Sequence, residues 1–249
     1  MSDETPQKKP RKKKAVAAEE KVDGRVELGH GDGANHGDGI RDDGALKDAV
    51  LAAALPDAVF DGFTEAVLAK AGASANVTAA ELARLFPEGP LSLIEYYSVA
   101  ADAQMEQRLA AMNLPGMKIR QRIAAAVLAR LSILKPNKEA ARRAGATLSL
   151  PMHAGLAARL MYRTVDAMWR AVGDTSTDFN FYTKRGILAG VYGATLLRWF
   201  NDTSEDEAVT TEFLAARIEN VMQFEKFKAQ AKKAFANFPS FGDFGKPKP

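Results

Sequence analysis

Few side chains in this chain are of a type that could do chemistry. It contains no cysteine and three histidines, so cysteine nucleophiles, disulfides and Cys-ligated zinc sites are excluded. His30 and His36 alternate with aspartates in a Gly-rich stretch. They could chelate a metal ion, although two imidazoles on a glycine-rich chain make a poor site and a solvated tail is the alternative. His153 stands at an expected helix start, where a structural role is favoured over that of a general base.

The spacing of the remaining polar residues matches no catalytic motif. There is no nucleophile elbow and no phosphate-binding glycine loop. The Glu-x-x-His pairs of di-iron carboxylate bundles are also missing from the sequence. We therefore expect a protein that is not an enzyme, with no catalytic residue, no metal and no cofactor.

Helical periodicity covers nearly all of the chain after residue 45, and no alternating strand pattern of useful length is present. Pro56 suits a helix start, Gly72 suits a helix end, and Thr78 with Glu81 forms a capping-box signature. The helix expected at about 178–200 is hydrophobic on nearly all sides, which predicts that it is buried. The pattern predicts an all-α fold of eight or nine helices, over 56–72, 78–86, 91–112, 119–134, 137–146, from Pro151 through Trp169, about 178–200, and after 201–204.

The chain of 249 residues divides by composition into three parts. Residues 1–45, with a cationic block followed by a Gly/Asp/His-rich stretch, are predicted to be disordered. Residues 46–223 form the expected helical domain, with a head at about 55–113 and a body at about 114–223, and 224–249 is rich in Phe and Lys. The longest uncharged apolar run, Gly186–Leu197, is shorter than the 20 or so residues that span a membrane.

Two resemblances agree with this division. The opening helices resemble the helix-turn-helix head of TetR-type regulators, whose helical body holds a ligand cavity and a dimer interface. The segment Val165–Trp169, followed by Gly173–Arg185, resembles the signature of a ubiquinone-biosynthesis accessory family. That family has a TetR-like fold, binds lipids and assists the demethoxyubiquinone hydroxylase. The likeness extends over about Leu55 to Gln223.

This resemblance implies a lipid site in the body. Isoprenoid quinone intermediates and phospholipid are the implied ligands, and the apolar second half could enclose a cavity or be a filled core. The family places a headgroup contact at the arginine that matches Arg185, whereas a salt bridge with Asp174 or Asp178 is the alternative. The expected lipid-binding residues are Arg185, Leu160, Met161, Ile187, Leu188, Val191 and Tyr192.

The same resemblance implies a docking patch for the hydroxylase. An aromatic and methionine anchor with flanking carboxylates has the composition of an interface hot spot. Phe181 occupies a position where eukaryotic members commonly carry Trp, so the indole N–H donor is lost. The expected partner-binding residues are Asp166, Met168, Asp178, Phe181 and Tyr182.

The charge of the head argues against DNA binding. Between Thr78 and Arg108 only Arg84 and Arg108 are basic, against five acidic residues, and phosphate contacts need Lys and Arg. A TetR-type ligand-responsive regulator and a structural subunit of the biosynthetic complex without its own ligand remain alternatives. We expect a homodimer, cytoplasmic and peripheral on the inner membrane of a bacterium.

The C-terminal segment predicts contact with an anionic membrane surface. Its phenylalanines form an aromatic stripe from Phe224 to Phe238, and its lysines lie mostly off that stripe. An interfacial helix has this arrangement. The alternative is that Phe224 and Phe227 pack back on the body.

Overall fold

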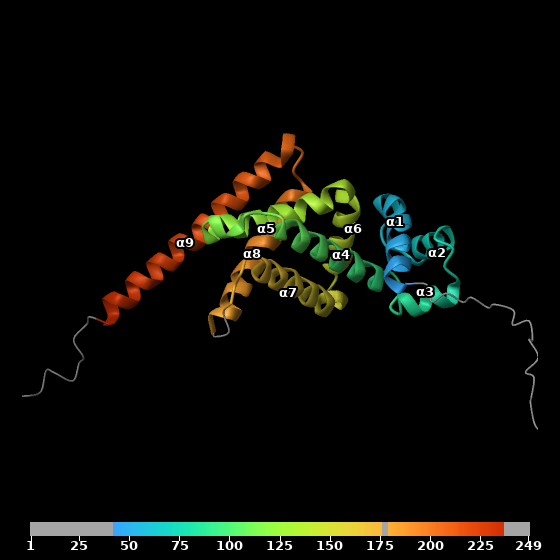
Figure 1. Cartoon of the computed structure of the whole chain (residues 1–249), viewed down its shortest axis with the longest axis horizontal. Coiled ribbons are helices and arrows are strands. Elements are labelled where there is room, and N and C mark those ends of the chain that lie inside the picture. The colour runs from blue at the N-terminus through green and yellow to red at the C-terminus, as the bar shows by residue number, and fades with distance from the viewer. Residues whose placement is uncertain (1–41, 176–178, 237–249) are drawn as a thin grey trace, which may run out of the picture. The chain divides into compact units, whose positions relative to one another are not determined.

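The computed structural model describes residues 42–175 and 179–236. The predicted all-α fold is confirmed: the described residues form nine α-helices with short 3₁₀ turns between some of them (Figure 1). The helices are α1 Asp43–Asp61, α2 Glu65–Ser74, α3 Ala79–Leu85, α4 Pro90–Ala110, α5 Ile119–Leu134, α6 Lys138–Leu148, α7 Ala154–Ala171, α8 Phe179–Phe200 and α9 Ala208–Ala236. The tail predicted to be disordered lies outside the described residues as far as residue 41, and so do His30 and His36, which were judged a poor metal site.

The first predicted helix, 56–72, is wrong in its limits. Asp42 caps α1 by accepting a hydrogen bond from the Gly44 amide, so the helix begins well before Pro56 and contains that proline. The chain then breaks at Gly62, whose positive φ of 69° suits a residue without Cβ. Thr64 starts α2 by accepting from the Val67 amide. The break changes the helical register, which leaves Phe60 76% exposed instead of in the core.

The helices α1, α2 and α3 pack in sequence as a small head (Figure 1). The capping box at the start of α3 is present: the Thr78 hydroxyl accepts from the Glu81 amide, and the Glu81 carboxylate accepts from the Thr78 amide. The two basic residues of α2 and α3, Lys70 and Arg84, pair with Asp57 and Asp43 of α1. The head is therefore held together partly by the cations that a DNA-reading head would present to phosphates.

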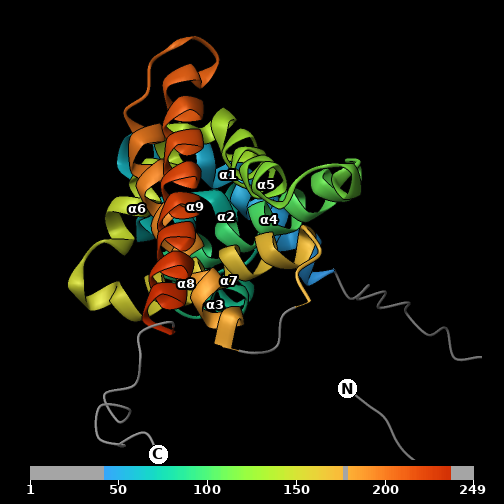
Figure 2. The ribbon, with the colours of Figure 1, turned by 90° about the vertical axis from the view of Figure 1, so that its left-hand side faces the viewer.

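The body is built around α4, which packs against both α5 and α7, while α8 packs on α7 and α9. Figure 2 shows the body from the side on which α9 faces the viewer. Apolar residues that recur at helical spacing on α4 and α5 form the core, with Leu93, Met105, Val127 and Leu131 almost completely buried. Full burial of α8 is wrong, because the exposed fraction reaches 68% at Leu197 and at Tyr182.

The turn between α8 and α9 is held by one buried carboxylate. Asp202 accepts hydrogen bonds from the amide and hydroxyl of Ser204 through Oδ1, and from those of Thr210 through Oδ2. These four bonds favour the ionised form and hold the pKa of Asp202 well below its usual range. The start of α9, which the sequence predicts to be capped at 201–204, is fixed in this way.

Replacement of Asp202 by Asn is expected to lower the free energy of unfolding at pH 7 by about 1–2 kcal/mol. A lowered folded-state pKa gives stability that is complete above the unfolded pKa, about 3.9, and is lost as the pH falls below it. The difference between wild type and D202N should therefore shrink from pH 6 towards pH 2. Urea unfolding followed by circular dichroism measures it, with the exposed Asp206→Asn as the matched control. An equal effect of both substitutions at pH 7 would contradict the assignment.

Candidate functional site

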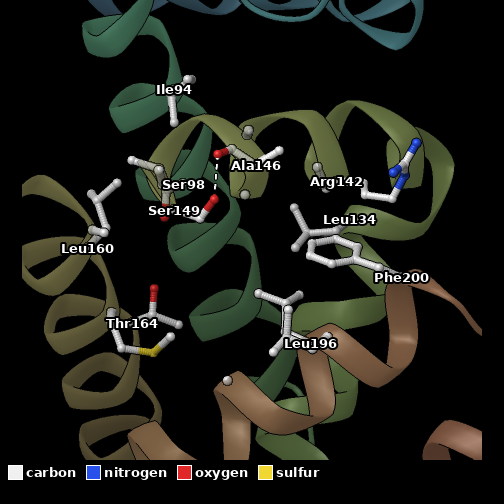
Figure 3. A pocket seen from close by; sticks show the side chains of 18 of the residues that line it. Ile94, Ser98, Leu134, Arg142, Ala146, Ser149, Leu160, Thr164, Leu196 and Phe200 are labelled. Carbon is white, nitrogen blue, oxygen red and sulfur yellow. Dashed lines mark hydrogen bonds between the residues drawn. The ribbon is translucent and has the colours of Figure 1, made fainter. Parts of the chain in front are cut away.

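A cavity of about 550 Å³ lies inside the body, between α4, α5, α6, α7 and α8. Its walls are mostly apolar, and Figure 3 shows Leu160 and Thr164 on one side, with Leu134 and Phe200 on the other. Ligand sites usually have volumes of about 300–1,000 Å³, apolar walls and a few placed polar groups. The cavity therefore has the size and lining of a site for an apolar small molecule.

One end of the cavity is open to solvent and the other is buried. The residues at the open end, Arg142, Ser149, Leu197 and Asn201, are exposed and come from α6, α8 and the turns that follow them. Gly145 forms part of this wall because a Cβ there would lie 3.3 Å from the ring of Phe200. A ligand can therefore enter only from this side of the described body and extend inwards along α7 and α8.

The buried end carries a charged cluster. Arg130 of α5 and Asp102 of α4 are 3% and 4% exposed, and their Nε and Oδ1 atoms lie 2.9 Å apart. Arg130 Nη2 donates to the Ser98 hydroxyl at 3.1 Å. The Thr164 hydroxyl of α7 donates to Asp102 Oδ2 at 3.1 Å. Three helices thus meet at one ion pair, which lies beside an otherwise apolar cavity.

Apart from Arg130 Nε, which is ion-paired with Asp102 Oδ1 but not hydrogen-bonded, two donors at this end have no hydrogen-bond partner among the described residues. They are Arg130 Nη1 and the Tyr97 hydroxyl, and both residues line the cavity. Burial raises the pKa of Tyr97 to about 12, with the Arg130 charge opposing the change, so the hydroxyl keeps its proton at neutral pH. A buried donor that is left unpaired costs about 1–3 kcal/mol, which makes such groups rare in native proteins.

The other two titrating groups at this end respond mainly to burial. Burial, partly offset by the charge of Arg130, raises the pKa of Asp102. Burial also raises the pKa of Tyr192, which lines the cavity beside Arg130. Arg130 is thus the group that favours an ionised Asp102 in a place where burial opposes it.

The structure brings part of the expected lipid site together. Leu160, Met161 and Tyr192 line the cavity. The other expected lipid residues of α8 do not: Leu188 and Val191 are buried in the core, and Ile187 is half-buried against it. These three lie on faces of α8 that pack against other helices, so for them the filled-core alternative applies.

Arg185 is not at the rim of the cavity. Its side chain is only 4% exposed, and its Nε lies 2.7 Å from Asp166 Oδ1 while Nη1 lies 3.4 Å from Asp174 Oδ2. Nη1 also donates to the Phe181 carbonyl, and the guanidinium stacks 3.3 Å from the centre of the Phe181 ring. The expected headgroup contact is therefore wrong in this structure, and the salt-bridge alternative holds through Asp174.

The expected docking residues separate into accessible and buried ones. Tyr182 is 68% exposed and packs edge-to-face on Phe181, which is half-buried beneath Arg185. Asp166 is partly exposed, with its carboxylate shared between Arg185 and Arg170. Met168 is completely buried in the core, so its expected contact with a partner is wrong. Asp178 lies outside the described residues.

Arg130 and Asp102 were not among the predicted site residues, although their positions in the sequence carry a signal. Arg130 follows Val127 by three residues and precedes Leu134 by four, so it occupies the buried stripe of α5. Asp102 lies in the same way between Ala101 and Met105 on the stripe of α4. A charge of each sign on the buried faces of two neighbouring helices indicates a buried ion pair.

His153 has the structural role that was favoured, with its Nδ1 2.9 Å from the Thr147 carbonyl oxygen. Within residues 42–175 and 179–236, no group of three or more His, Cys, Asp or Glu residues could hold a metal ion. Over the same ranges, no helix is long and apolar enough to cross a membrane.

Comparison with known proteins finds a family model that matches the cavity helices α7 and α8. The family model described as COQ9 matches residues 154–225. The segment that contains α7 and α8 is similar to COQ9. The predicted resemblance to a ubiquinone-biosynthesis family is thereby confirmed, and the matched segment includes Leu160, Thr164 and Tyr192 of the cavity wall.

Individual COQ9 proteins are similar over a longer part of the chain. The ubiquinone biosynthesis protein COQ9, mitochondrial, of Bos taurus is 32% identical over 194 residues, which are 75% of this chain and 60% of that protein. The Homo sapiens protein of the same name is 31% identical, over 75% of this chain and 61% of its own length. This chain thus spans about 60% of the length of these curated relatives.

A solved structure confirms the TetR-like fold. The TetR transcriptional regulator from Nitrosomonas europaea ATCC 19718 superposes with a TM-score of 0.58 at 22% identity, over 70% of this chain and 97% of that chain. Shared fold at this identity says nothing about function. The match to COQ9 and the TetR-like fold both include the helical body that contains the cavity.

Removal of the Arg185 side chain is expected to act on stability. Arg185→Ala removes this cation from Asp166 and Asp174, while Lys184 remains 2.8 Å from Asp174 and Arg170 remains 3.0 Å from Asp166, so the free energy of unfolding should fall by about 1–3 kcal/mol. Arg170→Ala, which removes a 60% exposed guanidinium, is the control and should cost less than about 1 kcal/mol. Urea unfolding measures both. If R185A is as stable as wild type but no longer binds lipid, the result would contradict this prediction and support the headgroup contact instead.

Proposed function

We propose that this protein is a lipid-binding accessory protein of ubiquinone biosynthesis. It binds isoprenoid quinone intermediates at a membrane and presents them to the demethoxyubiquinone hydroxylase. The observation that carries the proposal is the apolar cavity, because the helices that match COQ9 form two of its walls. The similar proteins from Bos taurus and Homo sapiens are ubiquinone biosynthesis proteins, which supports this pathway, and the apolar cavity supplies a reason for a lipid to bind.

In this proposal the chain binds its ligand and leaves the chemistry to the hydroxylase. The side chains around the cavity suit recognition: hydroxyl groups, the guanidinium groups of Arg130 and Arg142, and apolar surface. Met161 adds an adaptable thioether to the wall, which suits a flexible polyprenyl chain. A structural subunit without its own ligand has no use for such a cavity. A DNA-binding regulator is disfavoured by the charge of the head, because five acidic residues stand against two basic ones between Thr78 and Arg108.

Filling the cavity is expected to displace the lipid. A Cβ on Gly193 would lie 3.7 Å from Met161 Cε, at ordinary contact distance and within the cavity wall, so Gly193→Leu projects a side chain into the cavity. Protein purified without detergent should release isoprenoid quinone or phospholipid on organic extraction, and G193L should release at least tenfold less. Mass spectrometry of the extracts measures the difference.

The matched control is Gly190→Leu on the same helix. Gly190 is exposed, and a Cβ there meets nothing within 4 Å, so G190L should retain the wild-type amount of lipid. Wild-type protein that proves empty by native mass spectrometry would contradict the proposed lipid binding. The structural-subunit alternative would then be preferred.

The surface around Tyr182 is proposed to bind the hydroxylase. Tyr182→Ala should weaken binding by about 2 kcal/mol, some thirtyfold, since truncation of an aromatic anchor often costs this much. The substitution should leave stability nearly unchanged because the ring is exposed. Tyr162→Ala, which removes a 48% exposed ring of α7, is the control. Titration calorimetry with purified hydroxylase measures both, and equal affinities for wild type and Y182A would place the docking surface elsewhere.

The C-terminal part is proposed to contact anionic lipid. α9 continues without a break from Ala208 to Ala236, past the predicted boundary at residue 224, and Phe224 is 62% exposed. Exposure of Phe224 disfavours its packing on the body. Deletion of residues 225–249 should abolish salt-sensitive binding to anionic liposomes, because each lysine near such a surface contributes about 1 kcal/mol. Sedimentation of truncated and full-length protein to the same extent would exclude this anchor.

A further inference from the structure

The buried end of the cavity has a polarity that the proposed function does not require. A site for a hydrocarbon chain alone needs no polar group, yet Arg130 Nη1 and the Tyr97 hydroxyl both lie at this end without a hydrogen-bond partner among the described residues. Both side chains are more than nine-tenths buried. Such groups are normally paired, and those that remain in a cavity mark the place of a ligand atom.

We propose that the cavity binds its ligand with the head inwards, so that a neutral carbonyl or phenolic oxygen accepts hydrogen bonds from Arg130 Nη1 and the Tyr97 hydroxyl. This inference rests on the proposed function and specifies its substrate class: an apolar chain with an uncharged, oxygen-bearing head. The apolar tail of the ligand lies along the wall formed by Leu160, Met161 and Leu196 and leaves through the open end of the cavity.

The charge at this end favours a neutral acceptor over an anion. Asp102 lies 2.9 Å from Arg130 Nε, so the ion pair has no net charge to offer a phosphate. Asp102 is only 4% exposed, and its Oδ2 accepts a hydrogen bond from the Thr164 hydroxyl. Its carboxylate is therefore held close to any group that enters this end of the cavity. A phosphate at the buried end would face that carboxylate with little screening. A carbonyl oxygen gains both donors and meets no such repulsion.

The positions of the two donors determine where the ligand's oxygen can accept hydrogen bonds. Tyr97 comes from α4 and its ring stacks on Phe63 at a centroid distance of 6.1 Å, and the Arg130 side chain is held by Asp102 and Ser98. Both donors are therefore fixed before the ligand arrives. Groups that need no reordering give up less conformational entropy on binding, which favours a ligand whose oxygen fits between them.

The test uses three probes with the same decyl chain: decylubiquinone, decylbenzene and decyl phosphate. Their transfer from a cyclodextrin carrier to the protein gives the affinities. Wild type is expected to bind decylubiquinone at least tenfold more tightly than either of the others. Tyr97→Phe removes one donor, and Arg130→Lys removes Nη1 while keeping a cation near Asp102. Each substitution should weaken the binding of decylubiquinone five- to tenfold and leave the affinity for decylbenzene unchanged.

The matched control is Tyr96→Phe. Tyr96 is the neighbour of Tyr97 on α4, but its hydroxyl donates to Asp48 of α1 and does not line the cavity, so this variant should bind all three probes as wild type does. Tyr97→Phe retains the ring, so it keeps the test valid if Arg130→Lys fails to fold.

The other outcomes separate the two proposals. If wild type binds decylubiquinone and decylbenzene equally, or if Y97F weakens both equally, the cavity is a lipid site without head recognition and this inference fails alone. Tightest binding of decyl phosphate would also overturn it. If wild type binds none of the probes, the proposed lipid-binding function fails together with it.

Discussion

The body of this protein depends on the buried ion pair between Arg130 and Asp102. It joins α5 to α4, and the hydrogen bond from Thr164 adds α7 to the same point. Two charges removed from water lose several kcal/mol of hydration each, and their attraction offsets this loss only in good geometry. Here Arg130 Nε and Asp102 Oδ1 lie 2.9 Å apart without forming a hydrogen bond, so the pair depends on the packing of these helices to hold its two charges close together.

The same pair also decides what the cavity can be. Apolar side chains at positions 102 and 130 would complete the core of α4 and α5 and close its inner end. A charged pair needs partners for its remaining hydrogens, and the hydroxyls of Ser98 and Thr164 supply only some of them. The cavity is therefore polar at the end beside this incompletely bonded guanidinium and mostly apolar elsewhere. This difference between its two ends favours one orientation of a bound ligand.

Much of the fold follows from residue spacing. The limits of α5 and α8 agree with the periodicity, and Leu93, Val127 and Leu131 are core as their spacing predicts. The error at the first helix has a local cause, because Gly62 and Thr64 carry the real end and start signals while Pro56 is tolerated inside α1. Exposure on α8 could not be predicted, since it depends on which neighbours cover an apolar helix.

The site was less predictable than the fold. Three of the expected lipid residues, Leu160, Met161 and Tyr192, line the cavity. Arg185 was assigned to a ligand because a cation before an apolar helix has the same sequence signature at a cavity rim and in an ion pair. Only the folded position of Asp166, 19 residues earlier in the chain, distinguishes the two. Arg130 was missed because one charge within an apolar stripe is easily read as a surface residue.

The two ion networks meet on α7, and this has a mechanical consequence. Thr164 points to Asp102 on one side of the helix, and two residues later Asp166 points to Arg185 on another. Rotation of α7 about its own axis would stretch the first contact and the second together, because both are short and involve buried groups. Sliding along the axis would do the same. These two contacts therefore resist both rotation and sliding of α7, which fixes the position of the wall that the helix gives to the cavity.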